Sequence, residues 1–255
     1  MEALRVEGLS KDFGGVHALS NVSFSVEVGE RLAIIGPNGA GKTTLFNLLN
    51  GQLLPTAGWI QFFGQDITTM PTHRRAHLGQ GRSFQIISLF LNLTVLDNTL
   101  ITLHGTKRSR FQMFRPINRY EHLLTRAQEM LTSVALWEKK DEFVKNISYG
   151  EQRRLEIALT AASEPKLLLL DEPSSGLTAA EGVDIVTMIR NLGTDITVVV
   201  VAHDMDLVFG VADRIMVLHY GQLIADGTPE QIQADSRVKE IYMGIEEGTG
   251  NARAS

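Results

Sequence analysis

The sequence predicts an α/β fold whose core is a mainly parallel β-sheet. Residues 167–170 and 197–201 are almost entirely apolar, as in strands buried on both faces, and the stretch between them is long enough for a helix. Residues 31–35 form a third apolar strand, which a glycine-rich turn joins to another expected helix. Buried strands that alternate with helices favour a parallel sheet covered by helices.

The remaining elements form two further parts. We expect the β segments 4–6, 22–26 and 58–63 to make an N-terminal antiparallel β subdomain. Helical spacing recurs in the segments 94–103, 119–136 and 149–162. We therefore predict a single domain over residues 1–255, with an α/β core at about 1–85 and 161–255 and an inserted α-helical subdomain at 86–160.

Several helix starts carry capping signals. Thr94 and Asp97 have the spacing of a capping box, and so do Thr178 and Glu181. Thr228 places a cap directly before a proline, which suits the first position of a helix. The helix after the glycine-rich turn is expected to run from residue 41 to about 53.

Composition excludes several classes of function. The 255 residues are 44% hydrophobic, which allows a substantial core, and the net charge of −5 gives no reason to expect a nucleic-acid partner. Cysteine is absent, so disulfides and thiolate metal sites are excluded. No signal peptide is apparent, and no apolar run approaches the roughly 20 residues that cross a bilayer. Any role at a membrane is therefore expected to come through a partner.

The strongest motif lies between the strand at 31–35 and the helix after it, and it reads Gly36-Pro37-Asn38-Gly39-Ala40-Gly41-Lys42-Thr43. It matches the phosphate-loop pattern in full. Its glycines let backbone N–H groups point at phosphate oxygens, and the helix N-terminus adds partial positive charge. We expect Lys42 to reach the β- and γ-phosphates and the Thr43 hydroxyl to ligate Mg²⁺, with Thr44 as a further nucleotide contact. A chance glycine-rich turn is the alternative.

Two acids and a histidine follow the later buried strands. Asp171, at the tip of the strand 167–170, is placed to hold Mg²⁺, and Glu172 to orient or deprotonate the attacking water. His203 lies just past the strand 197–201 and should emerge at the same sheet edge, where it could donate a hydrogen bond to the γ-phosphate or to the attacking water. The alternatives are acids that merely end a strand and a surface histidine.

A second glycine-containing motif precedes these acids, and it reads Ile147-Ser148-Tyr149-Gly150-Glu151-Gln152-Arg153-Arg154. It resembles the signature of the ABC transporter ATPases, although Tyr149 replaces the commonest glycine. Ser148 and the N–H groups after it can form an anion site at a helix start, and a plain helix cap is a compatible reading. The resemblance implies that Ser148, Gly150 and Glu151 meet the ATP held by an opposite subunit, so that ATP joins a dimer.

The family's other motifs occur in order along nearly the whole chain. The segment 11–15 resembles its aromatic loop, in which Phe13 would stack on adenine; packing in the core is the alternative. Residues 83–85 resemble its glutamine loop, so Gln85 would sense Mg²⁺ and take part in catalysis. His203 falls where the switch histidine belongs. Thr178 replaces the usual aspartate of the dimer-contacting loop, which leaves its contact across the dimer open. The resemblance implies a P-loop NTPase core with both subdomains, an ATPase, and ATP and Mg²⁺ as cofactors.

Several segments look more specifically like subunits for branched-chain amino acid uptake, among them 71–76, 93–98, 148–158, 203–209, 227–230 and 238–244. Sister systems import urea, amides or other small polar solutes. This resemblance implies a homodimer or a heterodimer with a second ATPase, transmembrane permease subunits, indirectly a substrate-binding protein, and a peripheral location at the cytoplasmic face of the inner membrane. The basic stretch 104–126 could face lipid or a permease loop, or form a solvated surface.

Three other functions compete with an importer subunit. An exporter subunit would share all these motifs. A soluble ABC protein that acts on ribosomes or DNA would usually carry two cassettes or a long coiled coil, and neither is seen in the sequence. A small-molecule kinase would share the phosphate loop but has no need of the segment 148–152 or of Gln85.

Overall fold

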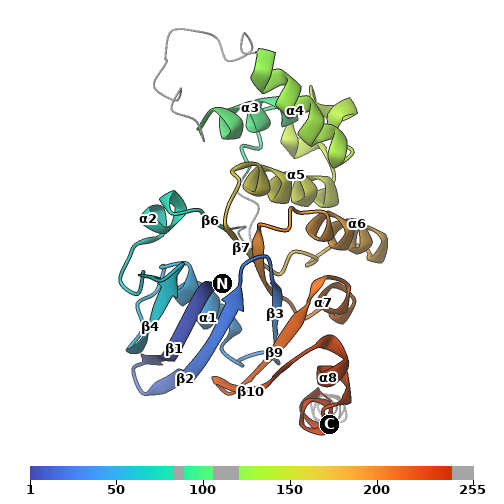
Figure 1. Cartoon of the computed structure of the whole chain (residues 1–255). Coiled ribbons are helices and arrows are strands. Elements are labelled where there is room, and N and C mark those ends of the chain that lie inside the picture. Colours follow the sequence, from blue (N-terminus) through green and yellow to red (C-terminus); the bar gives the residue numbers. More distant parts are fainter. Residues whose placement is uncertain (83–88, 106–120, 243–255) are drawn as a thin grey trace.

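The structure is a computed structural model, and it describes residues 1–82, 89–105 and 121–242. It confirms the predicted α/β fold: two β-sheets and their helices form a core, and further helices form a lobe at one end (Figure 1). Gln85 and most of the basic stretch lie outside the described residues.

The N-terminal strands form a four-stranded antiparallel sheet in the order β2-β1-β4-β5. Its strands are β1 (Glu2–Phe13), β2 (Val16–Glu27), β4 (Ala57–Phe62) and β5 (Gln65–Asp66). β1 and β2 have 12 residues each, so the predicted segments 4–6 and 22–26 were too short. The reason is that register shifts interrupt the pairing of β1 with β2, and regular alternation survives only in part of each strand.

The central sheet has six strands in the order β10-β9-β3-β8-β7-β6. They are β3 (Arg31–Ile35), β6 (Gln80–Arg82), β7 (Leu167–Asp171), β8 (Thr197–Val201), β9 (Arg214–His219) and β10 (Gln222–Gly227). All neighbours are parallel except β10 and β9, which are antiparallel. Every residue of β7 and β8 is buried, which confirms the two strands expected from their apolar sequences.

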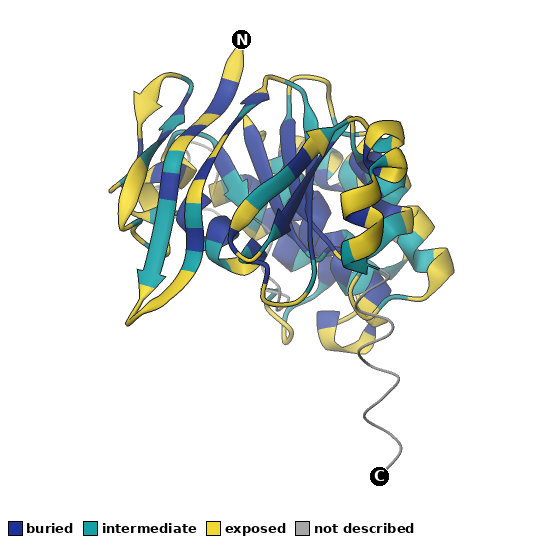
Figure 2. Cartoon of the chain, turned by 90° about the horizontal axis from the view of Figure 1, so that it is seen from below, coloured by how far each residue is buried: buried dark blue, intermediate teal, exposed yellow. Residues whose placement is uncertain are grey.

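Helices cover both faces of the central sheet. On one face α1 (Lys42–Leu49) packs with apolar residues of both sheets, so it lies between them. This helix is shorter than the predicted 41–53, because Gly51 has a positive φ of 79° and ends it. The other face is covered by α6 (Ala179–Arg190), α7 (Met205–Val211) and α8 (Pro229–Ala234). Figure 2 shows the buried strands between the antiparallel sheet and these helices.

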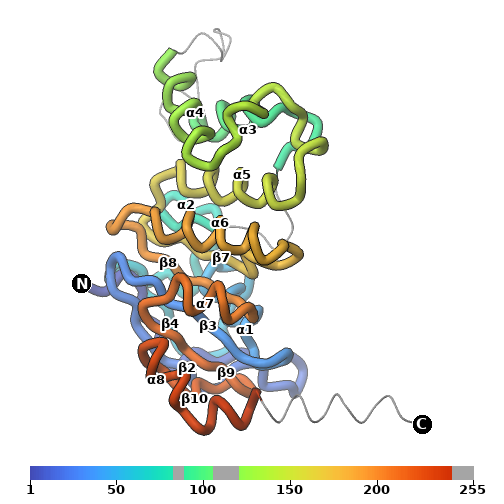
Figure 3. Tube along the Cα trace, turned by 90° about the vertical axis from the view of Figure 1, so that its right-hand side faces the viewer, coloured from blue at the N-terminus to red at the C-terminus, as the bar shows by residue number. Residues whose placement is uncertain are grey.

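The helical lobe contains α3 (Val95–Gly105), α4 (Glu121–Ser133) and α5 (Tyr149–Ala162), with short 3-10 turns at Trp137–Lys139 and Val144–Asn146. Figures 1 and 3 both place α3 and α4 at one end of the molecule, with α5 next to the core. Two small apolar clusters hold the lobe together, one of which includes Leu131, Leu136 and Leu155. The domain limits at 86 and 160 stay a prediction. In the described part of the chain, no helix combines the length and apolar character that a bilayer crossing requires.

Candidate functional site

Three neighbouring strands bring the predicted residues to one edge of the central sheet. β3 leads into the phosphate loop, β7 ends at Asp171, and β8 ends two residues before His203. Val201 of β8 is paired with both Ile34 and Asp171, so the three strands end at one level. Because ligands of open α/β sheets bind beyond the carboxyl ends of the strands, this edge is the candidate site. Here the Nδ1 atom of His203 lies 2.5 Å from the Oε2 atom of Glu172.

Two glycines of the phosphate loop, Gly36 and Gly41, are needed for space. A Cβ atom on Gly36 would lie 2.2 Å from the carbonyl oxygen of Leu218, and one on Gly41 would lie 2.6 Å from that of Ala18. The ammonium group of Lys42 donates to the carbonyl oxygens of Gly36 (2.6 Å) and Pro37 (3.0 Å). The rim of the loop is exposed at Asn38, Gly39 and Thr43, whereas Ala40 is buried and Thr44 is half-buried. The loop is thus a cradle with an accessible rim and a cation at its base.

Positive and negative side chains lie close together at this cradle and shift each other's pKa. Burial lowers the pKa of Lys42, while the negative charges of Glu172 and Asp171 raise it. Burial raises the pKa of Asp171, and the positive charges of Arg82 and Lys42 oppose that rise. A cation that faces a phosphate cradle and a buried carboxylate beside it fit a nucleoside triphosphate with Mg²⁺. Thr43 and Asp171 are the described residues that would hold the metal.

Arg82 is a site residue that sequence reasoning missed. It ends β6, and its Nη2 atom lies 3.9 Å from the Oδ2 atom of Asp171. Its guanidinium group also lies over the ring of Phe46 in α1, 4.8 Å from the ring centre. Its place just before the segment 83–85 could have identified it.

The backbone at Glu172 is unusual. Its φ of 47° lies in the left-handed region, where a side chain with a Cβ atom costs of order 1–3 kcal/mol. The Nη2 atom of the buried Arg153 in α5 donates to the carbonyl oxygen of Glu172 at 2.8 Å. The sequence motif contains Arg153, but it gives no indication that this arginine reaches the loop after β7.

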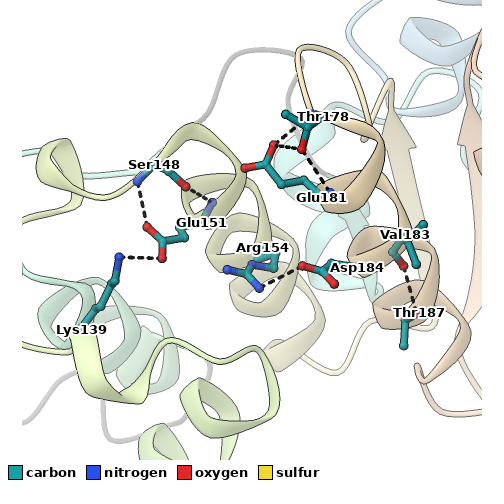
Figure 4. A network of polar contacts seen from close by, with 9 residues as sticks. All are labelled: Lys139, Ser148, Glu151, Arg154, Thr178, Glu181, Val183, Asp184 and Thr187. Carbon is teal, nitrogen blue, oxygen red and sulfur yellow. Dashed lines mark hydrogen bonds and ion pairs between the residues drawn. The ribbon is translucent and has the colours of Figure 1, made fainter.

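The serine-led helix start has the predicted cap, and the structure extends this cap to a full capping box with Glu151. The N–H group of Glu151 donates to the Ser148 hydroxyl at 3.2 Å, and the N–H group of Ser148 donates to the Glu151 carboxylate at 2.9 Å (Figure 4). Lys139 also binds this carboxylate, at 2.8 Å, and both contacts help to hold the pKa of Glu151 below its usual value despite partial burial. Ser148 is exposed and Gly150 is buried. The ATP contacts of all three residues stay a prediction.

Thr178 forms the second predicted capping box, at the start of α6. The N–H group of Glu181 donates to the Thr178 hydroxyl at 3.3 Å, and the N–H group of Thr178 donates to the Glu181 carboxylate at 2.9 Å (Figure 4). The helix cap therefore accounts for this threonine within the chain. A contact across a dimer stays a prediction.

Phe13 lies at the end of β1 and not in the core. The residue is 46% exposed, and the Lys11 ammonium lies 5.1 Å from the centre of its ring. The next strand, β2, reaches the phosphate loop, because Ala18 faces Gly41. The exposed ring is thus on the hairpin that borders the cradle, as adenine stacking requires.

Comparisons with known proteins agree with this geometry. A family model described as "ABC transporter" matches residues 19–175, and one described as "Branched-chain amino acid ATP-binding cassette transporter" matches residues 222–248. The chain is 38% identical over 250 residues to the high-affinity branched-chain amino acid transport ATP-binding protein BraF of Pseudomonas aeruginosa, with 94% of this chain and 97% of BraF covered.

Solved structures resemble the whole chain. The ADP conformation of MJ1267, an ATP-binding cassette of an ABC transporter, has a TM-score of 0.82 and 32% identity, covering 96% of this chain and 99% of MJ1267. The dimeric post-hydrolysis state of the cassette MJ0796, bound to ADP and Pi, has a TM-score of 0.75 and 26% identity, covering 88% of this chain and 98% of MJ0796.

Proposed function

Because the chain belongs to the ABC transporter ATP-binding proteins and is an ATPase, we propose that it powers an importer of branched-chain amino acids or of a related small polar solute. The proposal rests on one observation: the phosphate loop, Asp171 and the contacting pair Glu172 and His203 lie together at one edge of the central sheet. The family model for branched-chain amino acid cassettes matches residues 222–248, a segment that contains β10 and α8. This match supports an importer of that class of solute.

We assign the chemical steps to this chain's residues as follows. The backbone of the phosphate loop and Lys42 bind and orient the triphosphate of ATP, and the ring of Phe13 stacks on the base. Thr43 and Asp171, with Gln85, would hold Mg²⁺, and the bound ion would offset negative charge on the phosphates. Glu172 accepts the proton of the attacking water, and His203 holds the Glu172 carboxylate in place.

We further propose that two ATPase subunits clamp ATP between them, as a homodimer or as a heterodimer with a second ATPase. Ser148 and Gly150 of one subunit would contact the phosphate held by its mate. The dimeric state of MJ0796 supports this arrangement. The pair would bind transmembrane permease subunits at the cytoplasmic face of the inner membrane, and a substrate-binding protein would deliver the solute.

Uptake of labelled solute tests the transport function. Cells that depend on this subunit should accumulate leucine, isoleucine or valine with the wild-type chain and lose at least about nine-tenths of uptake with Lys42→Ala. Urea and an amide serve as alternative cargoes. An exporter subunit would instead lower accumulation, and vesicles of known orientation distinguish the two directions. Equal uptake of all these solutes with and without a working phosphate loop would contradict the proposal.

A further inference from the structure

The buried side chain of Arg153 joins α5, the helix capped by Ser148, to the loop after β7 that contains Glu172. We infer that Arg153 is a positioning residue that carries the state of one ATP site to Glu172 of the other. This inference rests on the proposed dimer, in which the start of α5 contacts the ATP held by the partner subunit. Glu172 acts on the ATP held by its own chain.

Arg153 binds three consecutive backbone carbonyls after β7. Its Nε atom donates to Pro173 at 3.2 Å, and its Nη2 atom donates to Glu172 at 2.8 Å and to Asp171 at 3.3 Å. These are the residues around the left-handed backbone of Glu172. A conformation that L side chains rarely adopt persists only where its surroundings hold it, and these hydrogen bonds supply such a hold.

Glu156, one helical turn further along α5, fixes the arginine from the other side. Its Oε2 atom lies 2.7 Å from the Nη1 atom of Arg153, and the two side chains are 6% and 0% exposed. A paired, buried guanidinium has little freedom to swing, because any other position would leave charge uncompensated inside the protein. The orientation of Arg153 is therefore set by α5 itself.

Three further contacts attach the beginning of α5 to the same segment. A Cβ atom on Gly150 would lie 2.2 Å from a Glu181 carboxylate oxygen, and one on Gly176 would lie 3.3 Å from the ring of Tyr149. Arg154 lies 3.2 Å from Asp184 (Figure 4). The first turns of α5 thus pack directly on the segment 171–184, and Arg153 is the member of this interface that binds the backbone of Glu172.

The consequence is a short path between the two ATP sites. A displacement of the α5 start, when Ser148 and Gly150 engage the partner's nucleotide, moves Arg153 with it. The carbonyl of Glu172 is then pulled or released, and the side chain that activates water changes position. Because a displacement of about 1 Å at a reacting group can cost about 100-fold in rate, a modest movement suffices.

The full-length Arg153→Met variant tests the inference, with the wild type measured first for ATP hydrolysis and ATP-dependent dimerisation. We expect kcat to fall about 10- to 100-fold, with the dissociation constant for ATP changed less than about 3-fold. The Glu172→Gln/Arg153→Met double variant should still dimerise with ATP, because the clamp itself is intact. Arg153→Lys, which can reach fewer carbonyls, should be intermediate, and Glu156→Gln should lower kcat in the same direction.

Arg214→Met is the matched control for lost stability. Arg214 lies at the start of β9, at the sheet edge opposite the phosphate loop, and binds Glu30 at 2.6 Å and Asp226 at 3.2 Å. The inference is overturned if Arg153→Met lowers kcat no more than Arg214→Met does, or if ATP affinity falls by the same factor as kcat. If Arg153→Met does not fold, unchanged kcat in both Arg153→Lys and Glu156→Gln overturns it. A wild type without ATP hydrolysis would contradict the proposed function instead.

Discussion

Replacing Arg75 by methionine should unfold the protein at a markedly lower temperature. Arg75 lies in α2 (Thr72–His77), is 1% exposed, and donates to five backbone carbonyls at 2.6–3.2 Å, those of Leu48, Leu49, Ile67, Thr68 and Met70. Two of them belong to the last turn of α1, the helix that follows the phosphate loop. The side chain therefore connects this helix end to the segment 67–70.

The size of the stability loss in Arg75→Met depends on which of the five carbonyl oxygens still accept a hydrogen bond from another donor. Leu48 still accepts from Gly51, Leu49 from Gln80, and Ile67 from the N–H group of Met70. Among the described residues, Thr68 and Met70 have no other donor to their carbonyl oxygens. Both residues are half-buried, so about 1.5 kcal/mol for each carbonyl, toward the lower end of the about 1–3 kcal/mol for a buried group left unsatisfied, gives a loss of about 3 kcal/mol. Methionine recovers part of the desolvation cost that lowers the pKa of Arg75 to about 10.

Thermal unfolding with Arg74→Met as the control measures this loss. Arg74 is the exposed neighbour in the same helix. A loss of about 3 kcal/mol should lower Tm by about 6–12 °C in a chain of this size. If Arg75→Met lowers Tm no more than Arg74→Met does, the five hydrogen bonds of Arg75 contribute no net stability and the prediction is wrong.

Other predictions concern the nucleotide site and the helix caps. Lys42→Ala should weaken ATP binding by about 10- to 100-fold in calorimetry, since a hydrogen bond to a charged group contributes about 1.5–3 kcal/mol; unchanged affinity would remove Lys42 from the phosphate site. Asp171→Asn should raise the Mg²⁺ concentration for half-maximal hydrolysis by at least about 10-fold, and removal of divalent cations by a chelator should stop hydrolysis of the wild type; turnover that persists in the chelator would contradict a metal role. Thr178→Ala should cost about 1 kcal/mol, with Thr178→Ser close to the wild type. Hydrogen bonds from the N–H group and the hydroxyl of Thr178 lower the pKa of Glu181, so the stability that these bonds contribute is present above the ordinary glutamate pKa and is lost as pH falls through the lower, folded-state pKa. Alanine keeps the N–H bond and loses the hydroxyl bond to the carboxylate, so the difference between Thr178→Ala and the wild type should shrink in acid by the hydroxyl part, and a constant difference from pH 7 to pH 3 would contradict a stabilising hydroxyl–carboxylate bond.

The fold could be predicted wherever local patterns coincide with tertiary burial. The strands at 31–35 and 197–201 and the helix at 149–162 have the predicted bounds, because each is an apolar or periodic segment with clear ends. β6, with three residues, and β5, with two, are too short to carry a pattern. β9 and β10 were not singled out, although the parallel pairing of β9 with β3 completes the sheet beside the phosphate loop.

The candidate site also contains residues that the sequence reveals and residues that only the structure reveals. Its motif residues could be found because phosphate binding demands glycines and a lysine at fixed spacing. The arginines behind these residues could not, since Arg75, Arg82 and Arg153 have partners that are distant in sequence and consist partly of backbone carbonyls. A charged residue is usually read as surface, and only the assembled fold shows that Arg75 and Arg153 are buried and Arg82 is half-buried.

The size of the Glu172→Gln variant with and without ATP is the decisive test of a dimer that ATP joins. Glutamine cannot take a proton from water, whereas the phosphate loop and Ser148 are untouched, so hydrolysis should fall at least about 100-fold and ATP should remain bound. We expect ATP and Mg²⁺ to convert this variant from monomer to a stable dimer, and adding Ser148→Arg to abolish the dimer. A persistent monomer under conditions in which ATP is shown to bind would contradict a dimer joined by ATP.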